Sequence, residues 1–325
     1  MSSSPVESRI SPLGALAVAV LAVSTSAILV RWSGAPSLVK AFYRVLFTGV
    51  ILAPWAVFRY RDHFARVRGR DLVVAAVSGT ALALHFASWF ESLNWTSVAA
   101  SVTLVQAQPA FVAVGAWALL DERVDRRVVA GIGVALAGMV VMSLPEAGGG
   151  AVAAPNPLLG NALAVVGAVT AAGYVLAGRS LRQRIALIPY VTVVYGVCVV
   201  VLGGLTLARH GPVAFVGYPG AGGVGATELY PASEWLLFLG MAVGPGIFGH
   251  TVINWALAHV ESSVVSVSLL GEPVGSTLLA LVLLNEVPTF VTLAGGAVVL
   301  TGIYVTTTVR EVEDGGPVET DPDAT

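Results

Sequence analysis

Long apolar runs, separated by short polar or Gly/Pro-rich breaks, constrain this chain more than any other feature of its sequence. A helix that crosses the hydrocarbon layer of a membrane needs about 20 mostly apolar residues. The runs are continuously apolar, which favours helices over an alternating β-barrel. We therefore predict an all-α polytopic membrane protein with ten transmembrane helices. The predicted spans are residues 12–31, 37–58, 71–92, 97–120, 127–144, 157–178, 187–208, 233–257, 262–284 and 289–309.

The charged residues are few and unevenly placed. They make up only 11% of the chain, against about 25% in soluble proteins, and the net charge of −2 gives no reason to expect a nucleic-acid partner. With a cytoplasmic N-terminus, thirteen arginines fall in the cytoplasmic segments, whereas only Arg31 and Arg209 fall in the outer loops. Because basic loops stay on the cytoplasmic side, we expect a multi-pass cell-membrane protein with both termini in the cytoplasm.

A shift of 164 residues aligns the fourth and fifth spans with the ninth and tenth without a gap. Pro109 then falls on Pro273, and Glu122 falls on Glu286. The shared glycines are Gly131 and Gly138 in the first copy and Gly295 and Gly302 in the second. A repeat of five spans is odd, so the second copy must be inverted in the membrane, an arrangement typical of secondary transporters. The glycines suit close helix packing or a dimer face.

The repeat sets the predicted domain organisation. A cytoplasmic N-terminus (1–11) precedes a first five-helix unit (12–144), an external linker (145–156) and a second five-helix unit (157–309). The last segment, residues 310–325, is acidic and is predicted to be a disordered cytoplasmic tail.

Corresponding segments of the two units resemble a known family. The first is 92–101 (SLNWTSVAAS), followed by Pro109 and 120–122 (LDE); the second is 256–257 (AL), followed by Pro273 and 284–288 (LNEVP). Arg44, early in the second span after Phe42 and Tyr43, also matches. The chain resembles two tandem EamA units of the drug/metabolite transporter superfamily over about residues 12–308. The resemblance implies a ten-helix carrier with inverted halves, a central cavity and a small solute such as an amino acid, a nucleotide sugar or a sugar phosphate.

Polar side chains inside the spans are candidates for the solute site, because a charge at lipid depth costs about 2.5–3.5 kcal/mol on insertion scales. Glu272 directly precedes Pro273, which removes a backbone hydrogen bond and frees carbonyls that could line a cavity. Its carboxylate could bind a cationic group or carry a proton, or it could pair with a helix-end donor or with Arg44. The equivalent position is the neutral Gln108, before Pro109.

Further candidates for the cavity are aromatic, imidazole and amide side chains of the spans. An imidazole can change protonation near neutral pH, although a buried histidine can also be a simple hydrogen-bonding residue. Aromatic rings can stack on a solute or only pack. Arg44 could attract an anion or extend its side chain to the interface, as we expect for Lys40. The remaining cavity candidates are His85, Trp89, Tyr174, His250, Asn254 and Ser268.

Glu122 and Glu286 end their spans on opposite membrane faces in the inverted repeat, so we expect them to cap helices or form gate salt bridges. We predict a secondary transporter of a small organic metabolite (an amino acid or similar) by alternating access, with or without proton-coupled export. Its expected partners are the solute, the bilayer and protons as coupling ion; monomer and homodimer both remain open.

No HExxH, P-loop lysine, Cys pair or Gly-x-Ser-x-Gly motif is present, so we expect no enzymatic activity, cofactor or metal site. Two alternatives remain, a membrane-embedded lipid-modifying enzyme and a non-transporting scaffold. The enzyme alternative depends on the acidic run 121–125 (DERVD), whose repeat copy lacks both aspartates.

Overall fold

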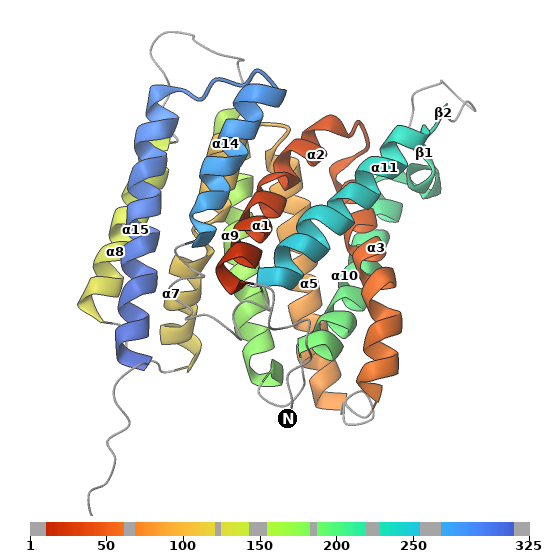
Figure 1. Cartoon of the computed structure of the whole chain (residues 1–325), viewed down its shortest axis with the longest axis horizontal. Helices are drawn as coiled ribbons and strands as arrows, with labels where there is room; N and C mark the ends of the chain where they lie inside the picture. Colours follow the sequence, from red (N-terminus) through yellow and green to blue (C-terminus); the bar gives the residue numbers. More distant parts are fainter. Residues whose placement is uncertain are drawn as a thin grey trace, which may run out of the picture.

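The computed structural model describes residues 11–61, 69–120, 125–142, 155–182, 187–218, 228–253 and 268–314. These residues form a bundle of helices with one short two-stranded sheet (Figure 1). In the first unit the helices are α1 (Pro12–Ser24), α2 (Ser26–Trp32), α3 (Ser37–Arg59), α5 (Gly69–Ser92), α6 (Val98–Val105), α7 (Gln108–Leu120) and α8 (Arg126–Met142). In the second they are α9 (Pro157–Arg182), α10 (Leu187–His210), η2 (Pro212–Phe215), α11 (Ala232–Met241), η3 (Ala242–Thr251), α14 (Gly271–Leu283) and α15 (Phe290–Asp314).

The two strands lie beyond the end of α10. Strand β1 (Gly217–Tyr218) pairs antiparallel with β2 (Glu228–Leu229), with Gly217 opposite Leu229. They sit at the same end of the bundle as the α2–α3 connection, as Figure 1 shows.

Seven helical segments among the described residues are long and apolar enough to cross a membrane. They are Leu13–Trp32, Ser37–Arg59, Gly69–Ser92, Val98–Leu119, Pro157–Gly178, Ile188–His210 and Ala232–Thr251, each at the place of a predicted span. The other predicted spans, 127–144, 262–284 and 289–309, contain α8, α14 and α15. Helix α15 ends at Asp314, so residues 310–314 are helical where the sequence predicted the start of a disordered tail.

Three spans in the described part are irregular where continuous helices were predicted. Helix α6 ends at Val105, because Pro109 has no N–H for the Val105 carbonyl, and α7 begins at Gln108. Between α1 and α2, the Thr25 hydroxyl donates to the carbonyl of Ala22 at 2.7 Å. Pro245 lies inside η3, a π-helix, in which the hydrogen bonds span one more residue than in an α-helix.

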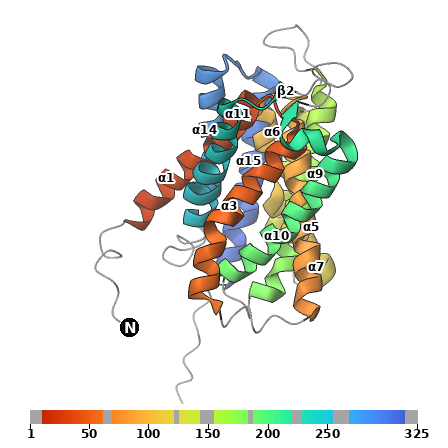
Figure 2. The same ribbon diagram turned by 90° about the vertical axis from the view of Figure 1, so that its right-hand side faces the viewer.

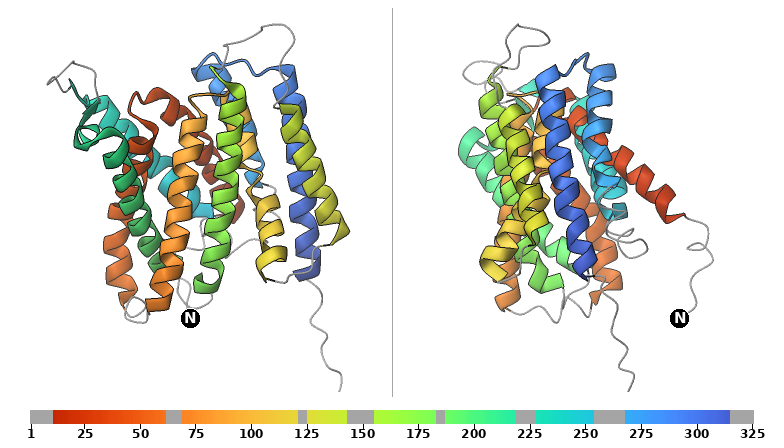
Figure 3. Two further views of the ribbon diagram at one scale, coloured as in Figure 1. Left: turned by 180° about the vertical axis from the view of Figure 1, so that it is seen from behind. Right: turned by 90° about the vertical axis from the view of Figure 1, so that its left-hand side faces the viewer.

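Helices of the two units pack against each other at several places in the bundle. Helix α8 lies against α15, α5 against α9, and α3 against α10, while α6 packs on α14 and α1 on η3. The α8–α15 pair stands at one side of the bundle, with α14 beside it (Figures 1 and 3), and Figure 2 shows the opposite side, with α3, α10 and α5. The two units therefore share an interface that includes a helix of every predicted span.

Glycines allow the close approach of α8 and α15. A Cβ on Gly138 would lie 2.6 Å from the backbone nitrogen of Val299 and 2.8 Å from the carbonyl oxygen of Gly295. A Cβ on Gly302 would meet the backbone of Ala135 and, at 2.6 Å, the carbonyl oxygen of Gly131. Both contacts are with backbone atoms, which cannot move aside as a flexible side chain can. We call this contact the glycine seam.

Filling the glycine seam is expected to destabilise the protein. Gly138→Val would force α8 and α15 apart, and overpacking of this kind costs about 1–3 kcal/mol. The control is Gly133→Val on the same helix, where an added Cβ meets nothing within 4 Å. Thermal unfolding in detergent should show a clearly lower Tm for Gly138→Val than for Gly133→Val. Equal Tm values for the two variants would contradict the close contact.

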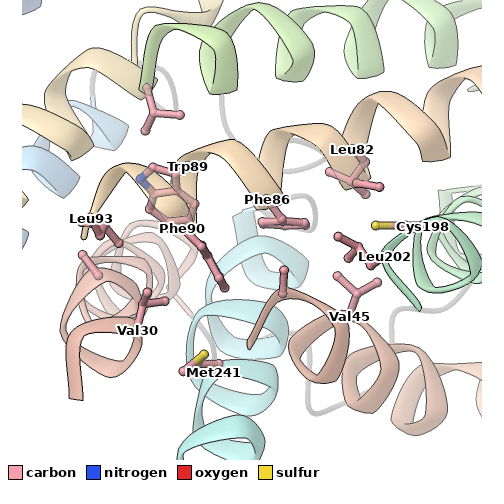
Figure 4. Packing of buried hydrophobic residues seen from close by; sticks show 14 of the residues in the cluster. Val30, Val45, Leu82, Phe86, Trp89, Phe90, Leu93, Cys198, Leu202 and Met241 are labelled. Atoms are coloured by element: carbon pink, nitrogen blue, oxygen red, sulfur yellow. The ribbon is translucent and has the colours of Figure 1, made fainter. Parts of the chain in front are cut away.

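The largest buried apolar cluster lies where α5 meets α2, α3, α10 and α11. It includes Phe86, Trp89 and Phe90 of α5. Figure 4 shows these rings on α5 with Val45 and Met241 facing them from α3 and α11. The cluster holds in place the aromatic side of the site described next.

Candidate functional site

The break in the fourth span and the start of α14 in the ninth are joined by a hydrogen bond between side chains. Gln106 lies between α6 and α7, and its Nε2 donates to Oε2 of Glu272 at 2.6 Å. Glu272 is in the first turn of α14 and is 9% exposed. The Ser24 hydroxyl, at the end of α1, lies 3.5 Å from the Glu272 carbonyl oxygen. The end of α1, the break between α6 and α7 and the start of α14 therefore meet at Glu272.

Arg44 is buried in the middle of the bundle, with 2% of its surface exposed. Its Nη1 donates to the Ser26 hydroxyl at 2.9 Å, directly after the break between α1 and α2. Its Cζ lies 4.6 Å from the ring centroid of Phe86 and 5.9 Å from that of Trp89, distances at which a guanidinium is attracted to an aromatic face. The alternative that Arg44 extends to the interface is wrong.

Lys40, one helical turn before Arg44, is also buried. Its ammonium group donates to the carbonyl of Val30 at 2.9 Å and so satisfies a carbonyl near the end of α2. The prediction that Lys40 reaches the interface is therefore wrong as well. A cation that caps a helix end is stabilised by the helix dipole without leaving the interior.

Glu272 and Arg44 interact electrostatically without forming an ion pair. Within the described residues, the ion pair closer than 4 Å is that of Arg31 with Glu286. Of the alternatives for Glu272, pairing with Arg44 is not observed, and its side-chain donor is an amide, Gln106. Two opposite charges are thus held near each other by separate partners.

The two candidate histidines belong to the same region. His85 has its Nδ1 2.9 Å from the carbonyl oxygen of Gly167 on α9, and its ring stacks on Trp89 with centroids 5.8 Å apart. His250, in η3, is exposed and interacts electrostatically with Arg44 and with His85. The role of the two histidines in a solute cavity stays a prediction, with His85 packed against Trp89 and His250 exposed.

Trp89 has a further distinction. It is 4% exposed, and its indole Nε1 is the buried side-chain nitrogen or oxygen atom that lacks a hydrogen-bond partner among the described residues. Buried polar atoms are almost always paired, so this N–H sets Trp89 apart from the other buried side chains of the described residues.

We call the region around Arg44 and Glu272 the centre. The other predicted cavity residues are as follows. Tyr174 stacks on Tyr190 at 6.4 Å, and its carbonyl accepts a hydrogen bond from Ser78. Gln108 is half-buried in the first turn of α7, and Ser268 is half-buried before α14. Pro109 follows the α6–α7 break, whereas Pro273 lies in the first turn of α14. Asn254 and Glu122 fall outside the described residues.

Glu286 and its partner Arg31 connect four chain segments at the end of the bundle where α2 is joined to α3. Its carboxylate accepts from Arg31 Nη2 at 3.1 Å and from the backbone N–H of Val98 at 2.5 Å. Arg31 Nη1 donates in turn to the carbonyl of Leu93 at 2.5 Å. The carboxylate therefore both forms the salt bridge and caps the start of α6, the two roles that the sequence suggested for it.

A second carboxylate, which the sequence reasoning missed, lies at the same end. Glu234 of α11 is 5% exposed and accepts from the Ser33 hydroxyl and the Gly34 N–H, each at 2.6 Å, and from the Tyr218 hydroxyl at 3.0 Å. Burial, together with this hydrogen bond, raises the pKa of Tyr218 to about 12. The sequence signal was a glutamate in the first turn of a helix, a common capping position. It did not show that the loop being capped belongs to the other unit.

Three residues of the centre also carried little signal in the sequence. Ser26 and Gln106 are polar positions inside apolar runs, and Tyr195 of α10 interacts electrostatically with Arg44. Serine and tyrosine are common in packed spans, so only their contact with a buried charge distinguishes them. In the described parts of the chain, no group of three or more His, Cys, Asp or Glu side chains is arranged to hold a metal ion.

Comparisons with known proteins agree with each other. The EamA-like transporter family matches residues 11–144 and 158–308. An uncharacterized transporter of Archaeoglobus fulgidus is 27% identical over 270 residues, which cover 82% of this chain and 86% of the relative. Another from the same organism is 32% identical over 210 residues, which cover 65% and 67%. A crystal structure of a protein with 23% identity covers 92% of this chain and 97% of its own at a TM-score of 0.58, a likeness of fold alone.

Proposed function

This chain belongs to the EamA-like transporter family as two tandem units, and from that premise we propose that it is a secondary carrier working by alternating access. It is a multi-pass membrane protein, and both its family and its named relatives are transporters. The solute is a small organic metabolite, an amino acid or similar. The carrying observation is that two buried groups of opposite charge, Arg44 and Glu272, lie at the α1–α2 break, the α6–α7 break and the start of α14.

Ten spans in two inverted halves fit the way the units pack. Several pairings of helices between the units are related by the exchange of the units: α5 on α9 corresponds to α1 on η3, and the pairs α6–α14 and α8–α15 each correspond to themselves. In the glycine seam, the contact of Gly138 with Gly295 corresponds to that of Gly302 with Gly131. In transporters built from inverted repeats, the solute site lies at the interface between the two repeats. The excess of arginine at one side supports cytoplasmic termini.

The outer end of the bundle is closed by contacts between the two units. Glu286 of the second unit holds Arg31 and Val98 of the first, and Glu234 of the second unit holds the loop at Ser33 and Gly34. Since alternating access requires this end to open, we assign Glu286 to an outer gate. Glu122 is its repeat counterpart for the cytoplasmic gate.

The direct test is transport by the purified protein in proteoliposomes. A labelled panel of amino acids, glucose 6-phosphate, a nucleotide sugar and putrescine is offered, with and without a pH gradient. Exchange of at least one solute, saturable and several times faster than in protein-free liposomes, is the expected result. If no solute on the panel exchanges or accumulates, the carrier proposal is rejected.

A further inference from the structure

The end of α3 opposite the Arg31–Glu286 contact carries exposed arginines. Arg59 is the last residue of α3, Arg61 follows it, and Arg70 lies at the start of α5; all three are exposed. Helices α3 and α5 pack on each other and on α10, and Figure 2 shows these ends of the two helices at the same side of the bundle. We call Arg59, Arg61 and Arg70 the basic patch.

Positive charge is in excess around the basic patch. Residues 59–71 contain five arginines and two aspartates, a net charge of +3. Asp71 is only 4% exposed, so its carboxylate does not belong to the surface. The ion pair among the described residues is that of Arg31 with Glu286, so no described carboxylate pairs with an arginine of the basic patch. The described part of the chain therefore supplies no counter-charge at this surface.

Aromatic side chains beside the basic patch indicate its depth in the membrane. The centroid of the Tyr60 ring lies 5.9 Å from Arg59 Cζ and 5.8 Å from the centroid of the Trp55 ring, which it meets edge to face. Tryptophan and tyrosine favour the level of the lipid headgroups. Phe58, directly before Arg59, is 90% exposed on a spanning helix, so its ring faces acyl chains in a membrane. The guanidinium groups therefore lie at the level of lipid phosphates, next to an apolar surface.

A second group of arginines lacks this combination. Arg126 and Arg127 are exposed at the start of α8 and belong to the same membrane side in the proposed topology. Residues 121–127 contain three arginines and three acidic residues, so their net charge is zero. The Asp125 carboxylate accepts from the backbone N–H groups of both arginines, at 2.7 and 3.2 Å. The two groups of arginines thus differ in local charge, which makes the second a control for the first.

We propose that the basic patch binds an anionic phospholipid, with the headgroup phosphate on the arginines and an acyl chain along Phe58 and Trp55. A basic residue at a membrane surface strengthens the binding of anionic lipid about fivefold. Phosphatidylcholine carries the same phosphate but also a cation, which the basic patch repels. A soluble anion gains nothing from the exposed apolar rings. The site belongs to the first unit alone and is independent of the solute that the protein carries.

The test is lipid binding by the full chain in detergent, measured by native mass spectrometry. The protein is titrated with dioleoylphosphatidylglycerol and, separately, with dioleoylphosphatidylcholine. Both lipids have the same acyl chains, so a difference in affinity comes from the headgroup. Phosphatidylglycerol should bind at least tenfold more tightly, and equal affinities overturn the proposal. Because transport is not measured, that failure leaves the carrier proposal standing.

Variants then locate the site. Arg59→Gln/Arg61→Gln should weaken the binding of phosphatidylglycerol about thirtyfold and leave that of phosphatidylcholine unchanged. Arg59→Lys/Arg61→Lys keeps the charge and should stay within a few-fold of the wild type; a loss as large as that of the Gln variant contradicts recognition by charge. Arg126→Gln/Arg127→Gln is the matched control and should keep the wild-type affinity. Equal losses in the two Gln variants mean that the lipid follows overall charge, and they overturn the assignment to the basic patch.

Thermal unfolding in detergent distinguishes other occupants of the basic patch. Phosphatidylglycerol should raise the Tm of the wild type but not that of Arg59→Gln/Arg61→Gln. Inorganic phosphate and glycerol 3-phosphate test a soluble phosphate, and a peptide of residues 311–325 tests the acidic C-terminal end of the chain itself. None of these should raise the Tm in a way that depends on the two arginines. If one of them does, the basic patch belongs to that occupant and the lipid proposal is overturned.

Discussion

Glu286→Ala is expected to open the outer end of the bundle, so that a membrane-impermeant thiol reagent labels a cysteine at position 101 about thirtyfold faster. Ser101 is fully buried on α6, one turn beyond the N–H that Glu286 caps. The substitution removes a partly exposed salt bridge with Arg31 and a helix cap, together worth about 2 kcal/mol. The experiment uses Ser101→Cys with the single native cysteine replaced by Cys198→Ala.

Glu286→Gln separates the two contributions. The amide oxygen can still accept from the Val98 N–H, but the charge facing Arg31 is lost, so labelling should rise only a few-fold. Glu228→Gln, on the exposed strand β2, should leave the rate unchanged. If Glu286→Ala labels no faster than the Ser101→Cys parent, the carboxylate does not gate this end.

Glu272→Gln is expected to remove the effect of a pH gradient on transport. If one proton exchanges for one solute, a gradient of one pH unit supports an accumulation of about tenfold. A permanently neutral amide cannot take up or release that proton, so the accumulation ratio should fall to about one. The residual exchange of the variant is measured at equal pH on both sides as the reference.

His85 is the competing proton carrier. His85→Asn keeps a group that can hydrogen-bond to the Gly167 carbonyl but cannot titrate. It should retain the tenfold accumulation if Glu272 is the carrier. If Glu272→Gln kept the tenfold accumulation ratio and His85→Asn lost it, His85 would be the proton carrier instead of Glu272.

The sequence predicted the helical spans well because burial in lipid leaves a simple signal. A run of about twenty apolar residues is typical of a membrane-spanning helix. Seven of the predicted segments are helices of spanning length in the structure. Of the two prolines singled out in the sequence, Pro109 follows a break and Pro273 lies in the first turn of α14, whereas the π-helix around Pro245 was not predicted. The break at Thr25 was not predictable in this way. At this break the Thr25 hydroxyl donates to a backbone carbonyl of its own helix. Many threonines in helices do not disturb the helix in this way, so the residue type alone does not predict a break.

The sequence predicted which charged residues belong to the centre, but not their positions or their hydrogen-bond partners. Glu272 and Arg44 stand out as charges inside apolar runs. The partners that fix them do not, because Ser26 and Gln106 are ordinary polar residues until the fold brings them to a charge. The placement of Arg44 and Lys40 also depended on tertiary structure. A long basic side chain near a span end can reach water, but here a carbonyl and two aromatic faces lie closer.

The glycine seam shows why two units in one chain differ from two identical chains. Its contacts are self-complementary, with Gly138 and Gly295 matched by Gly302 and Gly131, as in an isologous dimer interface. In a dimer of identical subunits every residue near the axis occurs twice, so a centre with Glu272 would carry two carboxylates facing each other. In the fused chain the equivalent position is Gln108. Fusion keeps the symmetric contact at the periphery and permits a single, unduplicated negative charge at the centre.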